Sequence, residues 1–212
     1  MRRILLPAAG LTVLALAWLG APHAVAPGPF SAHMIAHMAV VAVAAPLLAA
    51  AAAGSAFDPV RAAPGLFAPI PASFVELVLV WAWHAPVLHE SARLHAWAFA
   101  AEQGTFLFAG LLLWLSALGG DRGRGTDRRA AGVTALLFTS MHMTLLGALF
   151  AVTPRPLYEH AQHGVSAGAA LADQHAGGVI MLLAGGASYM AGALYLMARL
   201  LRHQAFGAGV RS

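Results

Sequence analysis

The sequence contains neither cysteine nor lysine, and 9% of its 212 residues are charged. Without cysteine, disulfides, thiolate metal sites and a cysteine nucleophile are excluded, so soft-metal chemistry would have to use histidine and methionine. Soluble domains carry about 25% charged residues. This chain is instead 60% hydrophobic, with a mean hydropathy of +0.74, which is typical of a membrane protein.

The apolar residues fall into blocks close to the roughly 20 residues that span a hydrocarbon core. They predict an all-α, polytopic transmembrane helical bundle, because a lipid-exposed span must satisfy its backbone internally. We expect about six spans, or five if the first is a cleaved signal. They lie near residues 4–20, 31–53, 69–83, 94–118, 131–152 and 177–198. Pro46 is expected to kink the second span.

The chain is expected to form one membrane domain with short flanking segments. Residues 1–26 are interpreted as a signal anchor or a signal peptide, since Arg2 and Arg3 precede a short apolar stretch. Residues 27–203 then form a single transmembrane bundle domain. Residues 204–212 are expected to be a short cytoplasmic tail.

The arginines predict the orientation of the bundle. Of the twelve, all but Arg93 and Arg155 fall in the termini or in loops on one side of the predicted bilayer. By the positive-inside rule that side is the cytoplasm. We therefore expect a multi-pass protein of the bacterial inner (cell) membrane, with a cytoplasmic N-terminus if it is uncleaved. Because arginines in short loops account for the pI of 10.7, no nucleic acid partner is expected.

The histidines gather on the opposite side. Nine of the eleven border the predicted outer loops, and the exceptions are His142, in mid-span, and His203, in the tail. Histidine was not used to predict the topology, so this asymmetry is an independent indication of function at the periplasmic face.

The strongest constellation is His33-Met34-Ile35-Ala36-His37-Met38. His33 and His37 lie one helical turn apart on one face, where both imidazoles can reach one ion. Met34 and Met38 repeat this spacing on a neighbouring stripe. Imidazole and thioether together suit copper, particularly Cu(I). The alternative is a pair of interfacial histidines bonded to carbonyls or lipid headgroups.

Other polar residues lie at similar predicted depth. His84 ends the third span and is either a further ligand or a polar helix terminus. Glu102 in the fourth span would be expensive to bury unpaired, and it is expected to support a ligand imidazole or to pair within the bundle. Asp173 opens the last span as an N-cap, and it or His175 could face the same cluster.

Five motifs in order resemble one known family. They are HMIAHM with APLL at 45–48, WHAP at 83–86, FLFAGLLLW at 106–114, LLGAL with PRPLY between 145 and 158, and DQHAGGVIM at 173–181. Together they resemble the polytopic cytochrome c oxidase assembly factor family of the CtaG type. The resemblance implies a role in maturing a haem-copper oxidase, plausibly in copper supply to its catalytic centre. The family's polar signature residues here are His33, His37, His84, Asp173 and Gln174.

The chain departs from this family at two positions. Gln103 follows Glu102 where the family pattern leads us to expect histidine, which removes a candidate ligand. His175 stands where the family more often has another residue, and it could compensate.

We therefore expect a non-enzyme that helps copper delivery to cytochrome c oxidase through a His/Met cluster. The expected metal ligands are His33, His37, His84, Met38, Asp173 and His175. Glu102, Gln103 and Gln174 are expected to support them by hydrogen bonding. The expected partners are cytochrome c oxidase subunits, the lipid bilayer and a periplasmic copper carrier.

Three alternatives remain open: a haem-b protein, a copper transporter and a metal-free structural chaperone for an oxidase subunit. In a transporter, His142 and Glu76 would supply the inner steps. His23, His89, His95, His160 and His163 are weaker ligand candidates.

Overall fold

The structure, a computed structural model, describes residues 2–120, 125–158 and 166–209. Over those ranges the chain forms helices and connecting loops and no strand, which confirms the predicted all-α class. The helices are α1 (Arg2–Trp18), α2 (Ala21–Val25), α3 (Pro29–Met38), the π-helix η1 (Ala39–Ala44), α4 (Ala45–Ala52), α5 (Pro59–Ala62), α6 (Pro69–Trp83), α7 (Pro86–Leu94), α8 (Ala96–Leu118), α9 (Gly125–Val152) and α10 (Ala167–Gly209).

Within the described residues, four helical segments are long and apolar enough to cross a membrane: Pro29–Ala52, Ala96–Leu118, Asp127–Val152 and Ala167–Arg202. A fifth candidate is the pair α6 and α7, which is bent by 71° at its break. The first predicted span is a shorter apolar helix, Ile4–Trp18, packed against α3, η1 and α4. The polytopic bundle is thus confirmed, with four or five spans by length and composition.

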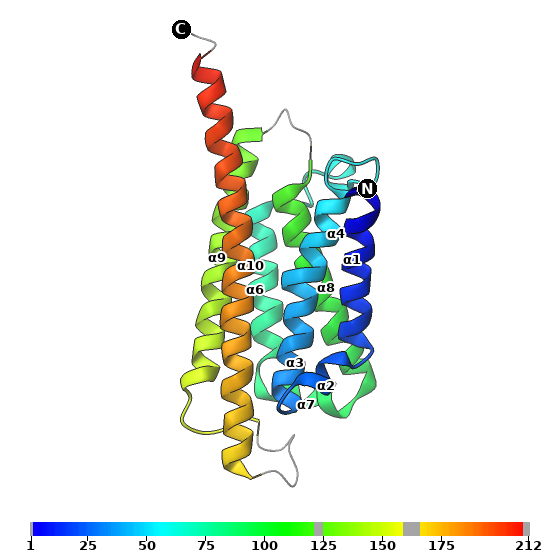
Figure 1. Ribbon diagram of the computed structural model, residues 1–212, viewed down its shortest axis with the longest axis vertical. Helices are drawn as coiled ribbons and strands as arrows, with labels where there is room; N and C mark the ends of the chain where they lie inside the picture. Colours follow the sequence, from blue (N-terminus) through cyan, green and yellow to red (C-terminus); the bar gives the residue numbers. More distant parts are fainter. Residues whose placement is uncertain (1, 121–124, 159–165, 210–212) are drawn as a thin grey trace.

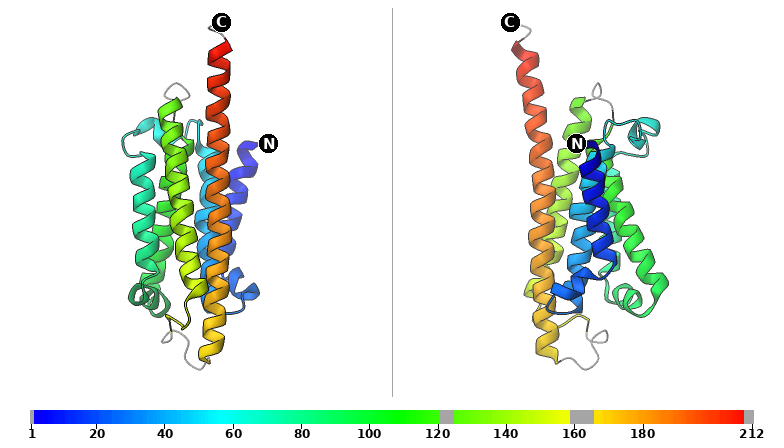
Figure 2. Two further views of the ribbon diagram at one scale, coloured as in Figure 1. Left: turned by 90° about the vertical axis from the view of Figure 1, so that its left-hand side faces the viewer. Right: turned by 45° about the vertical axis from the view of Figure 1, so that its right-hand side comes forward.

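The helices run along the long axis of the molecule (Figures 1 and 2). The start of α1 and the end of α10 lie at one end of the bundle, and α2 and α7 lie at the other. Because α10 continues to Gly209, most of the predicted tail extends this helix beyond the rest of the bundle.

Pro46 explains why η1 is a π-helix. Ala45 N donates to Val40 O, five residues back, and Pro46 has no N–H to continue the ladder. Two carbonyls are instead satisfied by other helices. Trp114 Nε1 donates to Val41 O at 3.1 Å, and Ser188 Oγ donates to Ala42 O at 2.6 Å. The proline that was predicted to kink this span thus joins it to α8 and α10.

Helices α9 and α10 approach closely through two glycines. A Cβ on Gly147 would lie 2.6 Å from Leu182 N, and one on Gly178 would lie 2.6 Å from Ala151 N. Each of these contacts is with backbone, which cannot move aside as a side chain can. Small residues are therefore needed for this helix pair to pack.

Candidate metal centre

The histidines that converge lie at the α2 and α7 end of the bundle (Figure 1). His33 and His37 come from α3, and His84 occupies the break between α6 and α7. Pro86 opens α7, since proline fits the first turn of a helix and cannot extend the preceding one. The 71° bend then brings His89 of α7 back against α3.

The four imidazole rings are close neighbours and are buried. Ring centroids are 4.8 Å apart for His33 and His89, 5.5 Å for His33 and His84, and 5.2 Å for His37 and His84. The His33 and His37 rings are nearly parallel, with centroids 6.3 Å apart. Each of the four residues is at most 4% exposed. The predicted convergence of His33, His37 and His84 is therefore present, with His89 added to it.

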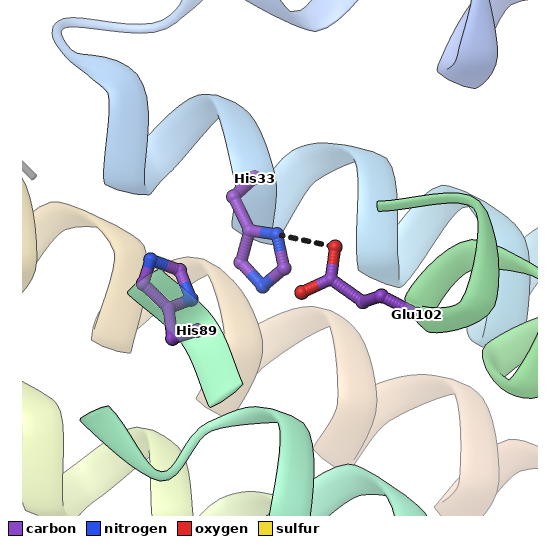
Figure 3. Close-up of side chains that lie close together, drawn as sticks. All are labelled: His33, His89 and Glu102. Atoms are coloured by element: carbon purple, nitrogen blue, oxygen red, sulfur yellow. Dashed lines mark ion pairs between the residues drawn. The ribbon is translucent and has the colours of Figure 1, made fainter. Parts of the chain in front are cut away.

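His33, His89 and Glu102 have the geometry of a metal site. Each offers one ligand atom, and these atoms lie within 4.8 Å of one another (Figure 3). Glu102 Oε2 is held by Arg93, whose Nη2 donates to it at 2.8 Å, and by Gln103 Nε2 at 3.1 Å. Glu102 Oε1 has no hydrogen-bond partner in the described part of the chain. One carboxylate oxygen is thus fixed and the other is available.

Several imidazole nitrogens also lack a hydrogen-bond partner among the described residues, while His33 Nδ1 lies 3.4 Å from Arg93 Nη2 and can only accept from it. Within residues 2–120, 125–158 and 166–209, no partner is found for His33 Nε2, His84 Nε2, His89 Nδ1 or either nitrogen of His37. His84 Nδ1 lies 2.6 Å from Val80 O, so it carries the proton and donates. The lone pair of His84 is therefore on Nε2, the nitrogen that is free to bind a metal.

Aromatic side chains enclose the cluster. Phe106 lies 4.0 Å from the His37 ring, and Tyr158 lies 4.4 Å from the His89 ring, both measured between ring centroids. The Tyr158 hydroxyl donates to His84 O at 2.7 Å. Burial raises the pKa of Tyr158 above its ordinary value, so the hydroxyl keeps this proton. These rings exclude water and fix the turn that carries His84.

Asp173 is joined to α3 by hydrogen bonds. Its Oδ2 accepts from Phe30 N at 2.8 Å and its Oδ1 from Ser31 N at 3.1 Å, and the Ser31 hydroxyl bonds to Oδ1 as well. Helix α10 begins at Ala167, so the prediction that Asp173 caps the last span is wrong. Its carboxylate instead caps α3, a helix from another part of the chain. Since α3 carries His33 and His37, Asp173 positions both of them.

The other predicted residues make bonds of their own. Gln174 Oε1 accepts from Leu157 N at 2.8 Å, and His175 Nε2 lies 2.9 Å from Thr153 O. Gln103 Oε1 accepts from Trp18 Nε1 at 3.1 Å, which links α1 to the site. Met38 is 3% exposed and lies in the hydrophobic core, where a Cβ added to Gly185 of α10 would be 3.5 Å from its sulfur.

Two further buried polar groups come from α9 and α6, and one of them, His142, lies within electrostatic range of His37. His142 on α9 is buried, and neither of its nitrogens bonds to a described residue. Glu76 on α6 accepts a hydrogen bond from the Tyr189 hydroxyl of α10. His23 and His95 are exposed, and His160 and His163 lie outside the described residues.

Sequence reasoning undervalued His89 and did not consider Arg93 as a site residue. Both lie on α7, three and seven residues after Pro86. That short helix was not predicted from the sequence, and its direction depends on the bend, which no local pattern reveals.

The sequence matches the family described as cytochrome c oxidase caa3 assembly factor over residues 1–203. The chain belongs to this family. No curated protein and no solved structure matches it. Polar residues from three of the motifs that carried the resemblance meet at one end of the bundle. His33, His37 and His84 supply imidazoles, and Asp173 fixes the helix that presents two of them.

Proposed function

We propose that this protein assists maturation of a cytochrome c oxidase by holding a copper ion transiently in its buried histidine cluster. The observation that carries the proposal is the set of imidazole nitrogens that are buried without a partner. Burying a polar group without a hydrogen bond is costly. A bound metal ion would satisfy several of these nitrogens at once.

The donor set favours a borderline or soft transition metal. Imidazole nitrogens from His33, His84 and His89, with Glu102 Oε1 beside them, suit copper or zinc better than magnesium or calcium. His37 lies one turn deeper and can take the same ion at an inner position. We choose copper over zinc because the family is described as an assembly factor for cytochrome c oxidase, and the resemblance implies copper supply to that enzyme.

Arg93 makes the site suited to release as well as to binding. Its guanidinium lies 2.8 Å from Glu102 Oε2 and 3.4 Å from His33 Nδ1. A fixed positive charge this close weakens the binding of a cation. A carrier needs such moderate affinity, because it must give the ion up to its partner.

The distribution of arginine supports a periplasmic position for the cluster. The end of the bundle opposite to it carries the N-terminus of α1 and the C-terminal half of α10, with Arg128, Arg129 and Arg199 near that end. By the positive-inside rule that end is cytoplasmic. Copper would then arrive from a periplasmic carrier and leave to an oxidase subunit, with no catalytic turnover.

Asp173, His175 and Met38 remain predicted auxiliary ligands. The first two already make hydrogen bonds to the backbone. The proposal therefore assigns the ion to the four histidines and Glu102, and it gives Asp173 a positioning role.

A metal-free chaperone is a second candidate, and the ion pair between Arg93 and Glu102 favours it. This pair neutralises the buried carboxylate without a metal. In that case the cluster would serve only to hold α3, α7 and α8 together.

Metal analysis of the purified protein separates the two. We expect copper in the native protein and its loss in the His33→Ala/His37→Ala double variant. His95→Ala, an exposed histidine in the same region, is the matched control and should retain copper. Equal copper in the native protein and the double variant, or zinc in place of copper, would contradict the copper proposal. Full oxidase maturation by the copper-free double variant would support the chaperone.

A further inference from the structure

A second site lies at the opposite end of the bundle from the histidines. A cavity of about 570 Å³ is bounded by α4, α8, α9 and α10. Apart from its arginines the lining is mainly apolar, with small residues such as Ala50 and Gly192 beside larger ones such as Trp114 and Leu118. Cavities of roughly 300–1,000 Å³ accommodate sizeable ligands.

The cavity follows from how the helices pack. Helix α10 packs against α3 and η1, whereas α4 packs against α1 and α8. The carbonyls of Val41 and Ala42 hold α8 and α10 at the level of the π-helix. Beyond that level, alanines and glycines on α4 and α10 leave the space between them unfilled.

Three arginines line the cavity: Arg128, Arg129 and Arg199. No carboxylate is among its described lining residues. Arg128 Nη2 donates to Phe67 O at 2.6 Å, while its buried Nε has no partner in the described ranges. Arg199 donates to the Tyr195 hydroxyl at 3.3 Å. Asp58 lies within electrostatic range of Arg128, so it offsets part of that charge, and its carboxylate accepts from Gly120 N at 2.9 Å and from Gly54 N at 2.7 Å.

The charge and the apolar lining together select an amphiphile. Arg199 and Gly192 are seven residues apart on α10, which places the charge about 10 Å along the helix axis from the apolar part. Phosphate groups are well matched to arginine, and basic pockets between membrane helices on the cytoplasmic side bind lipid headgroups. Haem is disfavoured, because neither histidine nor methionine is among the described residues that line the cavity.

We propose that this cavity binds an anionic phospholipid, with its phosphate on Arg128, Arg129 and Arg199 and an acyl chain along α4 and α10. The lipid would fill the gap between the two helices and stabilise the cytoplasmic end of the bundle. The proposal is independent of whether the histidine cluster holds copper.

The test is thermal unfolding of the purified full-length protein in detergent, with added phosphatidylglycerol or phosphatidylcholine. We expect phosphatidylglycerol to raise Tm in a saturable manner and phosphatidylcholine to have little effect. In Arg129→Gln/Arg199→Gln the affinity for phosphatidylglycerol should fall about fivefold per arginine, the factor that corresponds to ~1 kcal/mol per charge. Arg202→Gln is the matched control, since Arg202 is exposed on α10 one turn later and does not line the cavity.

A second variant tests the apolar part without removing charge. Ala50 is exposed and lines the cavity, so Ala50→Trp should fill it and abolish the stabilisation while the protein stays folded. Equal shifts with the two lipids, or an undiminished response in both Ala50→Trp and the arginine variant, would overturn the proposal. Inorganic phosphate that raises Tm as much as phosphatidylglycerol would overturn it too, because the site would then bind a free anion.

Discussion

Replacing Asp173 with alanine should destabilise the protein by removing the cap of α3. The carboxylate bonds to Phe30 N, Ser31 N and the Ser31 hydroxyl, and both residues are at most 2% exposed. Loss of an N-cap costs about 0.5–2 kcal/mol, and each buried donor left unsatisfied costs about 1–3 kcal/mol. Since the freed amides can relax in part, we expect a total of ~2–4 kcal/mol. For a chain of this size that corresponds to a fall in Tm of roughly 5–15 °C.

Thermal unfolding in detergent, followed by circular dichroism, measures this effect. Asp127→Ala is the control, because Asp127 is an exposed acidic residue in the first turn of α9, and it should leave Tm unchanged. Copper content measured on the folded Asp173→Ala variant then tests the role of the carboxylate. We expect copper to be retained at saturating metal. An unchanged Tm with complete loss of copper would refute the capping argument and make Asp173 a direct ligand.

Two further predictions concern the deeper bundle. Gly147→Ala should lower stability by ~1–3 kcal/mol, because its Cβ would lie 2.6 Å from the backbone of α10. Gly104→Ala is the control and should leave stability unchanged, because a Cβ there meets nothing within 4 Å. Equal Tm values for the two variants would contradict this packing. Glu76→Leu and Tyr189→Phe should each destabilise, and their double-mutant cycle should give a coupling of about 0.5–1.5 kcal/mol from the hydrogen bond between them. Additive effects in the unfolding free energy would show that this bond contributes nothing.

Much of the fold could be predicted from the sequence, because spans are set by length and hydropathy alone. The convergence of His33 with His37 followed from helical spacing, and the depth of His84 followed from the end of its span. Glu102 was expected to need a partner because it is buried, and Arg93 and Gln103 are the partners it has.

The rest depends on contacts between distant segments. His89 joins the cluster through the bend between α6 and α7, and a bend angle is set by tertiary packing. Asp173 was wrongly predicted to cap the last span, because the helix that it does cap, α3, lies more than 140 residues away in sequence. Pro46 indicated an irregularity, whereas the π-helix also required Trp114 and Ser188 to satisfy the carbonyls that it frees.

The most direct test of the central claim is X-ray absorption spectroscopy of the copper-loaded protein. The buried cluster predicts nitrogen or oxygen ligands with the outer-shell scattering of at least two imidazoles. That scattering should diminish in His33→Ala/His37→Ala and persist in His95→Ala. A spectrum without imidazole scattering, or one that is identical in the native protein and the double variant, would contradict the account.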